Sequence, residues 1–368
     1  MFAENRKISL RQLQAMLLLD FFGTAALFLP GEMAKAGGRG CWLLAGVCGL
    51  VFAVLSLLLT FLGKKMPEGT AVEWCRTLLG PLFGNLVLLG LGAKLFCDGA
   101  LELRIFSEII RRTMLPATPV WVLTLVVLLI AGALAAQGME CRGRTAEILF
   151  FLVSVPLLVV LLAVAFSAEY GRVLPLEPPA AEGWKDAFAS LGVLFQGLAF
   201  LYFIIPDLKK PQKMQRAVLA AGVHAALLFA ALTFLSLAVY GEVMLKQKLL
   251  PTLQMLERVS FTGIFLTRQD VLLLWFWIAS VSVFLSGTLF FSSLMGVRMA
   301  GQTEAKRKNW LYAALAVLFL LCFLPEDMAQ AHEFRLRASL WLNGFYLLVL
   351  PALLLFLAAV RKKGGKAV

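Results

Sequence analysis

Ten runs of mainly apolar residues follow one another along the chain, separated by short segments rich in glycine, proline and charge. A helix rises about 1.5 Å per residue, so about 20 apolar residues cross the roughly 30 Å hydrocarbon core of a bilayer. The pattern therefore predicts an all-α, polytopic protein with one integral membrane domain over 1–368. The predicted spans are 12–35, 40–62, 82–110, 118–136, 146–167, 187–206, 215–240, 270–297, 309–325 and 337–360.

The first run is interrupted by Gly23-Thr24 near its middle and by Pro30-Gly31 further along. Backbone groups that unwinding sets free are tolerated at membrane depth only where they are buried in protein or line a cavity. We therefore expect a broken first helix, whose break forms part of a ligand site.

The ten spans divide into two groups of five, 12–167 and 187–360. Because five is odd, a duplicated second group enters the membrane from the opposite side, which predicts two inverted repeats. The sixth run carries Gly192 and Gln196-Gly197 and ends at Pro206, so glycine is again followed by proline. The first and sixth helices are both predicted to be broken around a midplane site. The alternative is that these glycines only allow helices to pack closely.

Composition supports a membrane protein, because 61% of the residues are hydrophobic and 15% are charged. Soluble domains have about 25% charged residues. Basic residues are unevenly distributed between alternate connections, with 20 on the side of the N-terminus and 12 on the other side. Cytoplasmic connections retain basic residues, so both termini are expected to be cytoplasmic. Membrane topology thus explains the net charge of +12, and no nucleic-acid partner is expected.

The N-terminal region also has features of a secretory signal, with Arg6, Lys7 and Arg11 before an apolar run and Ala34-Lys35-Ala36 after it. The run is longer than the roughly 7–15 residues of a signal core. We therefore assign it as the first membrane span.

Several short stretches of the sequence carry a family resemblance. They are Lys7-Ile8-Ser9 with Gln12-Leu13, GTAALFLPGEMAKAGG from Gly23, LRIFSEIIRRTMLPATPVWVL from Leu103, RTAEILFFLVSVPLL from Arg144 and FIIPDLKKPQK from Phe203. These stretches resemble the B-subunit permeases of bacterial spore germinant receptors, within the amino acid-polyamine-organocation superfamily. The resemblance implies a ten-span fold with an inverted-repeat (LeuT-like) core and a role in sensing an amino acid or similar nutrient. It also implies an A-subunit and a lipoprotein C-subunit as partners, in the spore inner membrane or cell membrane.

A zwitterionic ligand presents a carboxylate and an ammonium group. The N-terminus of a half-helix offers free amides with a partial positive charge, and unwound carbonyls suit the ammonium. We expect Gly23, Thr24 and Ala25 to supply amides to the carboxylate, and Gln196 and Gly197 to complete the site. For Thr24, the alternative is a hydroxyl that bonds back to a carbonyl one turn earlier.

The third span is unusually charged, because Lys94, Asp98 and Glu102 share one helix face at spacings of four residues. Charges at this depth are costly in lipid, so this face is expected to point into the bundle. One interpretation is a Lys94–Asp98 ion pair that fixes the helix, with Asp20 as an additional partner of Lys94. The other is a proton relay or a gate beside the cavity.

Three further residues have weaker claims on the ligand site. Phe96 lies on another side of the third span and is a candidate apolar wall of the pocket, with ordinary packing as the alternative. Ser282 and Ser286 in the eighth span either reach the cavity or make contacts between helices.

Three classes of function fit a polytopic membrane protein: a receptor subunit, an amino-acid permease coupled to protons or sodium, and an intramembrane enzyme. The six cysteines and two histidines show no spacing typical of a metal site, a disulfide framework or a catalytic centre, so no enzyme, metal or cofactor is expected. Receptor and permease share the predicted fold and pocket, and the resemblance favours the receptor.

We expect Gly23→Ala or Gly197→Leu to abolish the response to the nutrient without preventing membrane insertion, because the added side chain fills the space in which the ligand approaches the backbone. The measurement is the germination response at unchanged nutrient concentration. A full response in either variant would contradict the site.

Overall fold

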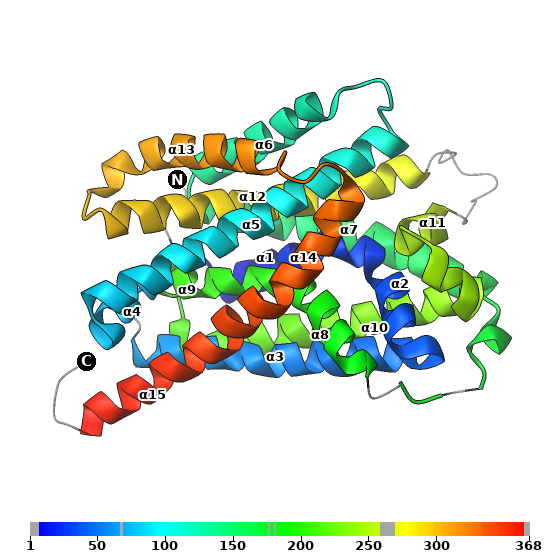
Figure 1. Cartoon of the computed structure of the whole chain (residues 1–368), viewed down its shortest axis with the longest axis horizontal. Helices are drawn as coiled ribbons and strands as arrows, with labels where there is room; N and C mark the ends of the chain where they lie inside the picture. The colour runs from blue at the N-terminus through cyan, green and yellow to red at the C-terminus, as the bar shows by residue number, and fades with distance from the viewer. Residues whose placement is uncertain (1–6, 67–68, 176, 180–181, 258–268, 364–368) are drawn as a thin grey trace.

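A computed structural model describes residues 7–66, 69–175, 177–179, 182–257 and 269–363, and these residues form a bundle of helices (Figure 1). The helices of the first half are α1 (Leu10–Phe21), α2 (Ala25–Gly37), α3 (Cys41–Lys65), α4 (Ala71–Leu79), α5 (Pro81–Thr113), α6 (Val120–Ala136) and α7 (Met139–Ser167). Those of the second half are α8 (Gly183–Leu194), α9 (Leu201–Ile204), α10 (Met214–Gln247), α11 (Pro251–Glu257), α12 (Gln269–Met299), α13 (Arg307–Leu321), α14 (Met328–Asn343) and α15 (Leu350–Lys363).

Each predicted span contains at least one helix, so the all-α polytopic fold is confirmed. Six stretches of the described residues are long and apolar enough to cross a membrane: Ala25–Lys65, Met139–Ser167, Gly183–Asp207, Pro211–Gln247, Trp277–Met299 and Met328–Val360. The other predicted spans are less apolar or shorter. Helix α5 carries Lys94, Asp98 and Glu102 along its middle, while α6 and α13 have 17 and 15 residues.

The first span is broken as predicted, because α1 ends at Phe21 and α2 begins at Ala25. A capping box starts α1, in which the Ser9 hydroxyl accepts from the Gln12 amide while the Gln12 side chain accepts from the Ser9 amide. Pro30 lies inside α2 and has no amide to donate to Ala26 one turn earlier. The Thr252 hydroxyl of α11 donates to that carbonyl at 2.8 Å, so α2 continues through the proline.

The sixth span is interrupted in a different way from the first. Its helix narrows to a 3-10 stretch, Phe195–Phe200, between α8 and α9, and the chain continues in the same direction. This stretch packs against α1, where a Cβ added to Gly197 would lie only 2.7 Å from the Asp20 Cβ. The glycine is therefore used for close approach of the two interrupted spans, and the sixth span keeps helical backbone through its interruption.

Burial separates a central group of helices from a peripheral one. The apolar windows of Trp277–Met299 and Gly183–Asp207 are 89% and 83% buried, against 28% for Met139–Ser167. Helix α1 contacts α7, α10, α12 and the 3-10 stretch, and Figure 1 shows it inside the bundle. The interrupted spans and α12 thus form the core, and α7 presents much of its surface outward.

The two halves are connected at several points around this core. Ile8, just before α1, pairs with Leu208 after the sixth span in a parallel bridge. Helices α14 and α15 cross the front of the molecule obliquely in Figure 1, and α14 contacts both α5 and α8. Through these contacts α14 brings its side chains close to the break in the first span.

The contact between α3 and α10 depends on small residues. A Cβ added to Gly222 of α10 would lie 2.6 Å from the Ala53 Cβ and 2.9 Å from its Cα on α3. We expect Gly222→Ala to lower the free energy of unfolding by about 1–3 kcal/mol, because overpacking forces the helices apart. Denaturant titration in detergent micelles measures the change. Gly171→Ala is the control, since its Cβ would meet nothing within 4 Å; equal effects would contradict this packing.

Candidate functional site: a buried carboxylate at the helix 1 break

The break between α1 and α2 holds a buried carboxylate, that of Glu102 on α5. The Thr24 amide donates to Glu102 Oε1 at 2.6 Å, and the Thr24 hydroxyl donates to Oε2 at 2.8 Å. Glu102 and Thr24 are both fully buried. Gly23 gives the carboxylate its space, because a Cβ there would lie 2.7 Å from Glu102 Oε1. The free N-terminus of α2 thus binds an anion, as helix N-termini favour.

Arg335 of α14 completes the charge balance at the break. Its Nη1 donates to Glu102 Oε2 and to the Thr24 hydroxyl, both at 2.8 Å, and its side chain is 1% exposed. The guanidinium also lies over the Phe28 ring, 5.9 Å from its centroid. Hydrogen bonds between ionised partners are stronger than neutral ones, and here they join three helices distant in sequence, α2, α5 and α14.

The carbonyl side of the break is also occupied by side chains. The Ser280 hydroxyl of α12 lies within hydrogen-bond distance of the Leu19 and Phe22 carbonyls, and Trp277 Nε1 donates to the Gly23 carbonyl at 3.3 Å. Buried backbone groups without partners are costly, and these side chains add to the bonds that the Leu19 and Gly23 carbonyls accept from the Phe22 and Ala26 amides. Both ends of the interrupted helix are therefore stabilised by groups of the chain itself.

A second buried ion pair lies one turn before the break. Arg142 Nη2 of α7 donates to both Asp20 carboxylate oxygens at 2.9 Å, and its Nε donates to the Val283 carbonyl at 3.3 Å. The guanidinium also lies over Phe200 of the 3-10 stretch, 5.2 Å from the ring centroid. Asp20 and Arg142 therefore connect α1 with α7, α12 and the sixth span.

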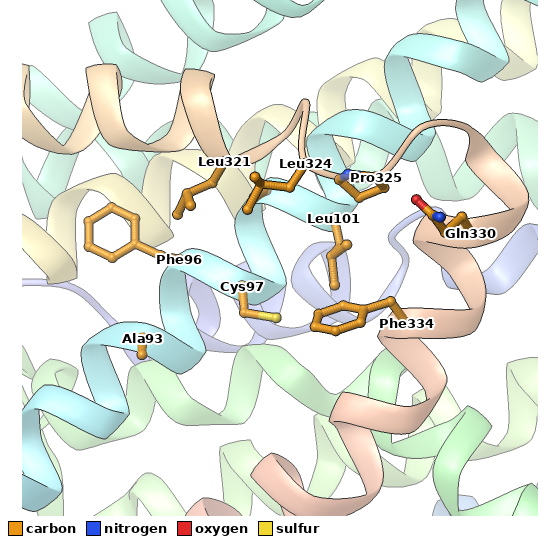
Figure 2. Close-up of a pocket in the computed structure, with 10 residues that line it drawn as sticks. Ala93, Phe96, Cys97, Leu101, Leu321, Leu324, Pro325, Gln330 and Phe334 are labelled. Carbon is orange, nitrogen blue, oxygen red and sulfur yellow. The ribbon is translucent and has the colours of Figure 1, made fainter.

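Two cavities flank α14, and their sizes differ greatly. The cavity beside the break holds about one water molecule, about 10 Å³, between Ala25, Glu32, Ser190 and His332 among others. The larger cavity, about 540 Å³, is lined almost entirely by apolar side chains of α5, α13, α14 and the segment before α14 (Figure 2). Phe96 lines the larger cavity, to which α1, α2 and α8 contribute no residue.

Comparison with known proteins identifies the family. A family model described as "Spore germination protein" matches residues 7–331. The chain belongs to this family. It is 24% identical to spore germination protein B2 of Bacillus subtilis (strain 168), covering 98% of both chains. It is also 23% identical to spore germination protein YndE of the same strain, covering 100% of both chains.

Solved structures share the fold of this germination protein. MhsT in complex with L-phenylalanine has a TM-score of 0.65 at 13% identity, covering 92% of this chain and 87% of MhsT. Mhp1, a nucleobase-cation symporter in a closed conformation with bromovinylhydantoin bound, has a TM-score of 0.66 at 14% identity and covers 93% and 78%. The LeuT-like architecture expected from the sequence is therefore confirmed.

The charged residues predicted on the third span occupy two separate contacts. Lys94 and Asp98 form an ion pair with each other. Glu102, one turn further along, binds Thr24 and Arg335 at the break. Asp20 was expected as an additional partner of Lys94, and here it pairs with Arg142, whose guanidinium reaches α1 from α7.

The residues predicted to bind ligand are only partly gathered at the break. Of the Gly23, Thr24 and Ala25 amides, that of Thr24 donates to a carboxylate, and this carboxylate is intramolecular. The Ser286 hydroxyl donates to the Val283 carbonyl of its own helix. Gln196 Oε1 and Ser282 Oγ are buried without a partner among the described residues, and Phe96 lines the larger cavity beside α14.

Arg335 and Arg142 were not predicted as site residues. Both lie near the end of an apolar run, so they were counted as charges of the connections, one on each side of the membrane. Removing both from the count leaves the excess of basic residues unchanged. The available sequence signal was an arginine within one or two turns of a span, close enough for its long side chain to reach the bundle interior.

Asp20 and Arg142 provide a test of the buried charge contacts. Removing one partner leaves a buried charge unpaired, so we expect Asp20→Asn and Arg142→Gln each to lower the free energy of unfolding by about 3–5 kcal/mol. The double variant should lose less than the sum of the two, as measured by denaturant titration in micelles.

Arg144→Gln is the matched control, because Arg144 pairs with Glu140 on the outer part of the same helix and is 46% exposed. Its expected loss is below about 1 kcal/mol. Additive losses in the Asp20–Arg142 cycle would show that the two side chains do not interact.

Proposed function

We propose that this protein is a transporter-like membrane subunit of a spore germinant receptor, which binds an amino acid or similar small nutrient at the helix 1 break and signals its presence. The observation that carries this proposal is the bound carboxylate of Glu102 at the N-terminus of α2. It supports an anion-binding role for the Thr24 amide, the Thr24 hydroxyl and Arg335. The carboxylate of a free amino acid has the same chemistry as that of Glu102.

Family membership supports signalling as the output. The relatives are spore germination proteins by name, and the matched region covers most of the chain. Ligand binding shifts a conformational equilibrium only when the ligand binds the two states with different affinities. At the break, a ligand contacts groups that hold α2, α5 and α14 together, so its binding would change the relative stability of their arrangements.

Transport is the second candidate, because the fold is shared with MhsT and Mhp1. Under this alternative, the same site alternates between the two faces of the membrane and the nutrient accumulates across it. The family and its structural neighbours do not suggest an enzyme, and a binding or transport role is proposed in either case.

The remaining expectations concern orientation and assembly. We infer that both termini are cytoplasmic, on the excess of basic residues on the N-terminal side. An A-subunit and a lipoprotein C-subunit are proposed as partners in the spore inner membrane, with the cell membrane as the alternative location. These proposals rest on the resemblance to B-subunit permeases.

Binding and flux measurements on the purified protein distinguish the two candidates. We expect at least one of the twenty amino acids to raise the thermal stability, since a ligand at 100 times its Kd stabilises by about 2.7 kcal/mol. In vesicles, we expect no accumulation of that amino acid under a proton or sodium gradient. Accumulation driven by a gradient would contradict the receptor function and support the permease function.

Gly23→Ala tests whether the amino acid binds at the break, because its Cβ would lie 2.7 Å from Glu102 Oε1 and disturb the site. This variant should insert into the membrane and lose the stabilisation by the amino acid. A protein that none of the twenty amino acids stabilises would contradict an amino acid as the nutrient.

A further inference from the structure

Glu102 and Arg335 are opposite charges, both nearly or fully buried, that meet at the interruption of a membrane helix. The carboxylate already occupies the position at which the N-terminus of α2 would bind the carboxylate of a ligand. The acceptor is therefore part of the protein, tethered to α5. A ligand that enters this site therefore has to displace the Glu102 carboxylate with its own carboxylate.

One hydrogen-bond donor of the arginine that binds the Glu102 carboxylate has no acceptor in the part of the chain that the structure describes. Arg335 Nη1 serves both Glu102 and Thr24, whereas Arg335 Nε is buried without a partner among the described residues. A guanidinium presents a planar array of donors that binds a carboxylate through two nitrogens. Arg335 thus contacts Thr24 and Glu102 through Nη1 alone and keeps Nε as an unused donor.

A small cavity beside the break provides the beginning of a space for the ligand. The cavity for about one water molecule is lined by Ala25, next to Thr24, and by His332 and Leu336, which flank Arg335 in sequence. An amino acid is larger than this cavity. Its entry therefore requires α2, α8 and α14, the three helices that enclose the cavity, to separate.

We propose that Glu102 holds the ligand's carboxylate position when the site is empty, and that an α-amino acid binds by inserting between Glu102 and Arg335. The ligand carboxylate takes the Thr24 amide, the Thr24 hydroxyl and Arg335. Glu102 moves away from Thr24 and accepts the ligand ammonium. This inference rests on the proposed function and names the two groups of the site that recognise the two charges of the ligand.

Charge balance favours this insertion. A zwitterion has no net charge, so after insertion the carboxylate faces Arg335 and the ammonium faces Glu102. Each buried charge keeps an opposite partner, and no proton has to be taken up or released. An ion that enters alone, either a carboxylate or an amine, leaves one buried charge unpaired, which is strongly unfavourable.

The proposal predicts selectivity for molecules that carry both charges. Alanine, propionate and ethylamine share a two-carbon skeleton beside their charged groups, and they differ by the ammonium or the carboxylate. For an amino acid that the wild-type protein binds, we expect the analogue without the amino group and the analogue without the carboxylate to bind at least tenfold more weakly. Isothermal calorimetry on the full chain in micelles measures these affinities.

Glu102→Ala is the deciding variant. It vacates the carboxylate position and removes the partner of the ammonium, while Thr24 and Arg335 stay. We expect it to gain saturable binding of propionate, which the wild-type protein binds weakly, and to lose the preference for alanine over propionate at least tenfold. Adding Arg335→Gln to this variant should abolish the gained propionate binding.

Glu108→Ala is the matched control, because Glu108 is another buried glutamate of α5 and pairs with Arg104 and Arg111, at 3.2 and 3.0 Å. It should keep the wild-type selectivity. Glu102→Gln preserves side-chain volume, so it serves if the alanine variant fails to fold, and the same loss of preference for the ammonium group is expected.

Two results would overturn the inference. One is a wild-type protein that binds an amino acid while Glu102→Ala and Glu102→Gln keep its preference over the analogue without the amino group. The other is a Glu102→Ala variant that folds and binds no propionate. Failure of the proposed function is a different result, in which no nutrient binds to the wild-type protein, while propionate binding by Glu102→Ala would still show a vacated carboxylate position.

Discussion

The contact between the Glu102 carboxylate and the amide of Thr24, the residue just before α2, is the interaction on which the site depends. A helix that stops in the middle of a membrane leaves amides and carbonyls without partners, and lipid cannot supply any. Here the Thr24 amide is bound by Glu102, and Arg335 balances the charge of that carboxylate. Without these two side chains the break would leave buried donors unsatisfied, at a cost of about 1–3 kcal/mol for each group.

The same interaction relates structure to function, because it joins three helices that are far apart in the sequence. Thr24 belongs to the first span, Glu102 to α5 and Arg335 to α14, and Ser280 and Trp277 of α12 satisfy the carbonyl side of the break. A molecule that replaces one of these contacts weakens a connection between helices. By replacing such a contact, a small nutrient would change the arrangement of the helices without being transported across the membrane.

The sequence predicted those features that depend on local residue types, such as the length of an apolar run or the position of a glycine. Ten apolar runs predicted the helices, and Gly23 lies at the break that was predicted there, whereas Pro30 lies inside α2. The sixth span was less well predicted. Gly197 suggested unwinding, and the structure shows a 3-10 stretch in which the glycine lets the span approach Asp20.

The ion-pair partner of each buried charged residue could not be predicted from the sequence, because it depends on tertiary contacts. Lys94, Asp98 and Glu102 share a helix face, yet Glu102 is bound by an arginine more than 200 residues away. Arg142 and Arg335 lie close to the ends of apolar runs, so their charges were assigned to connections. Their long side chains in fact reach the bundle interior, where they decide which carboxylate is bound by which cation.

Experimental structures of the protein with and without a bound amino acid would test the central claim most directly. Without ligand, the account predicts an interrupted first span, with Glu102 on the Thr24 amide and Arg335. With ligand, it predicts the ligand carboxylate in that place and Glu102 on the ligand ammonium. A continuous first helix, or an amino acid bound elsewhere while Glu102 stays on Thr24, would contradict it.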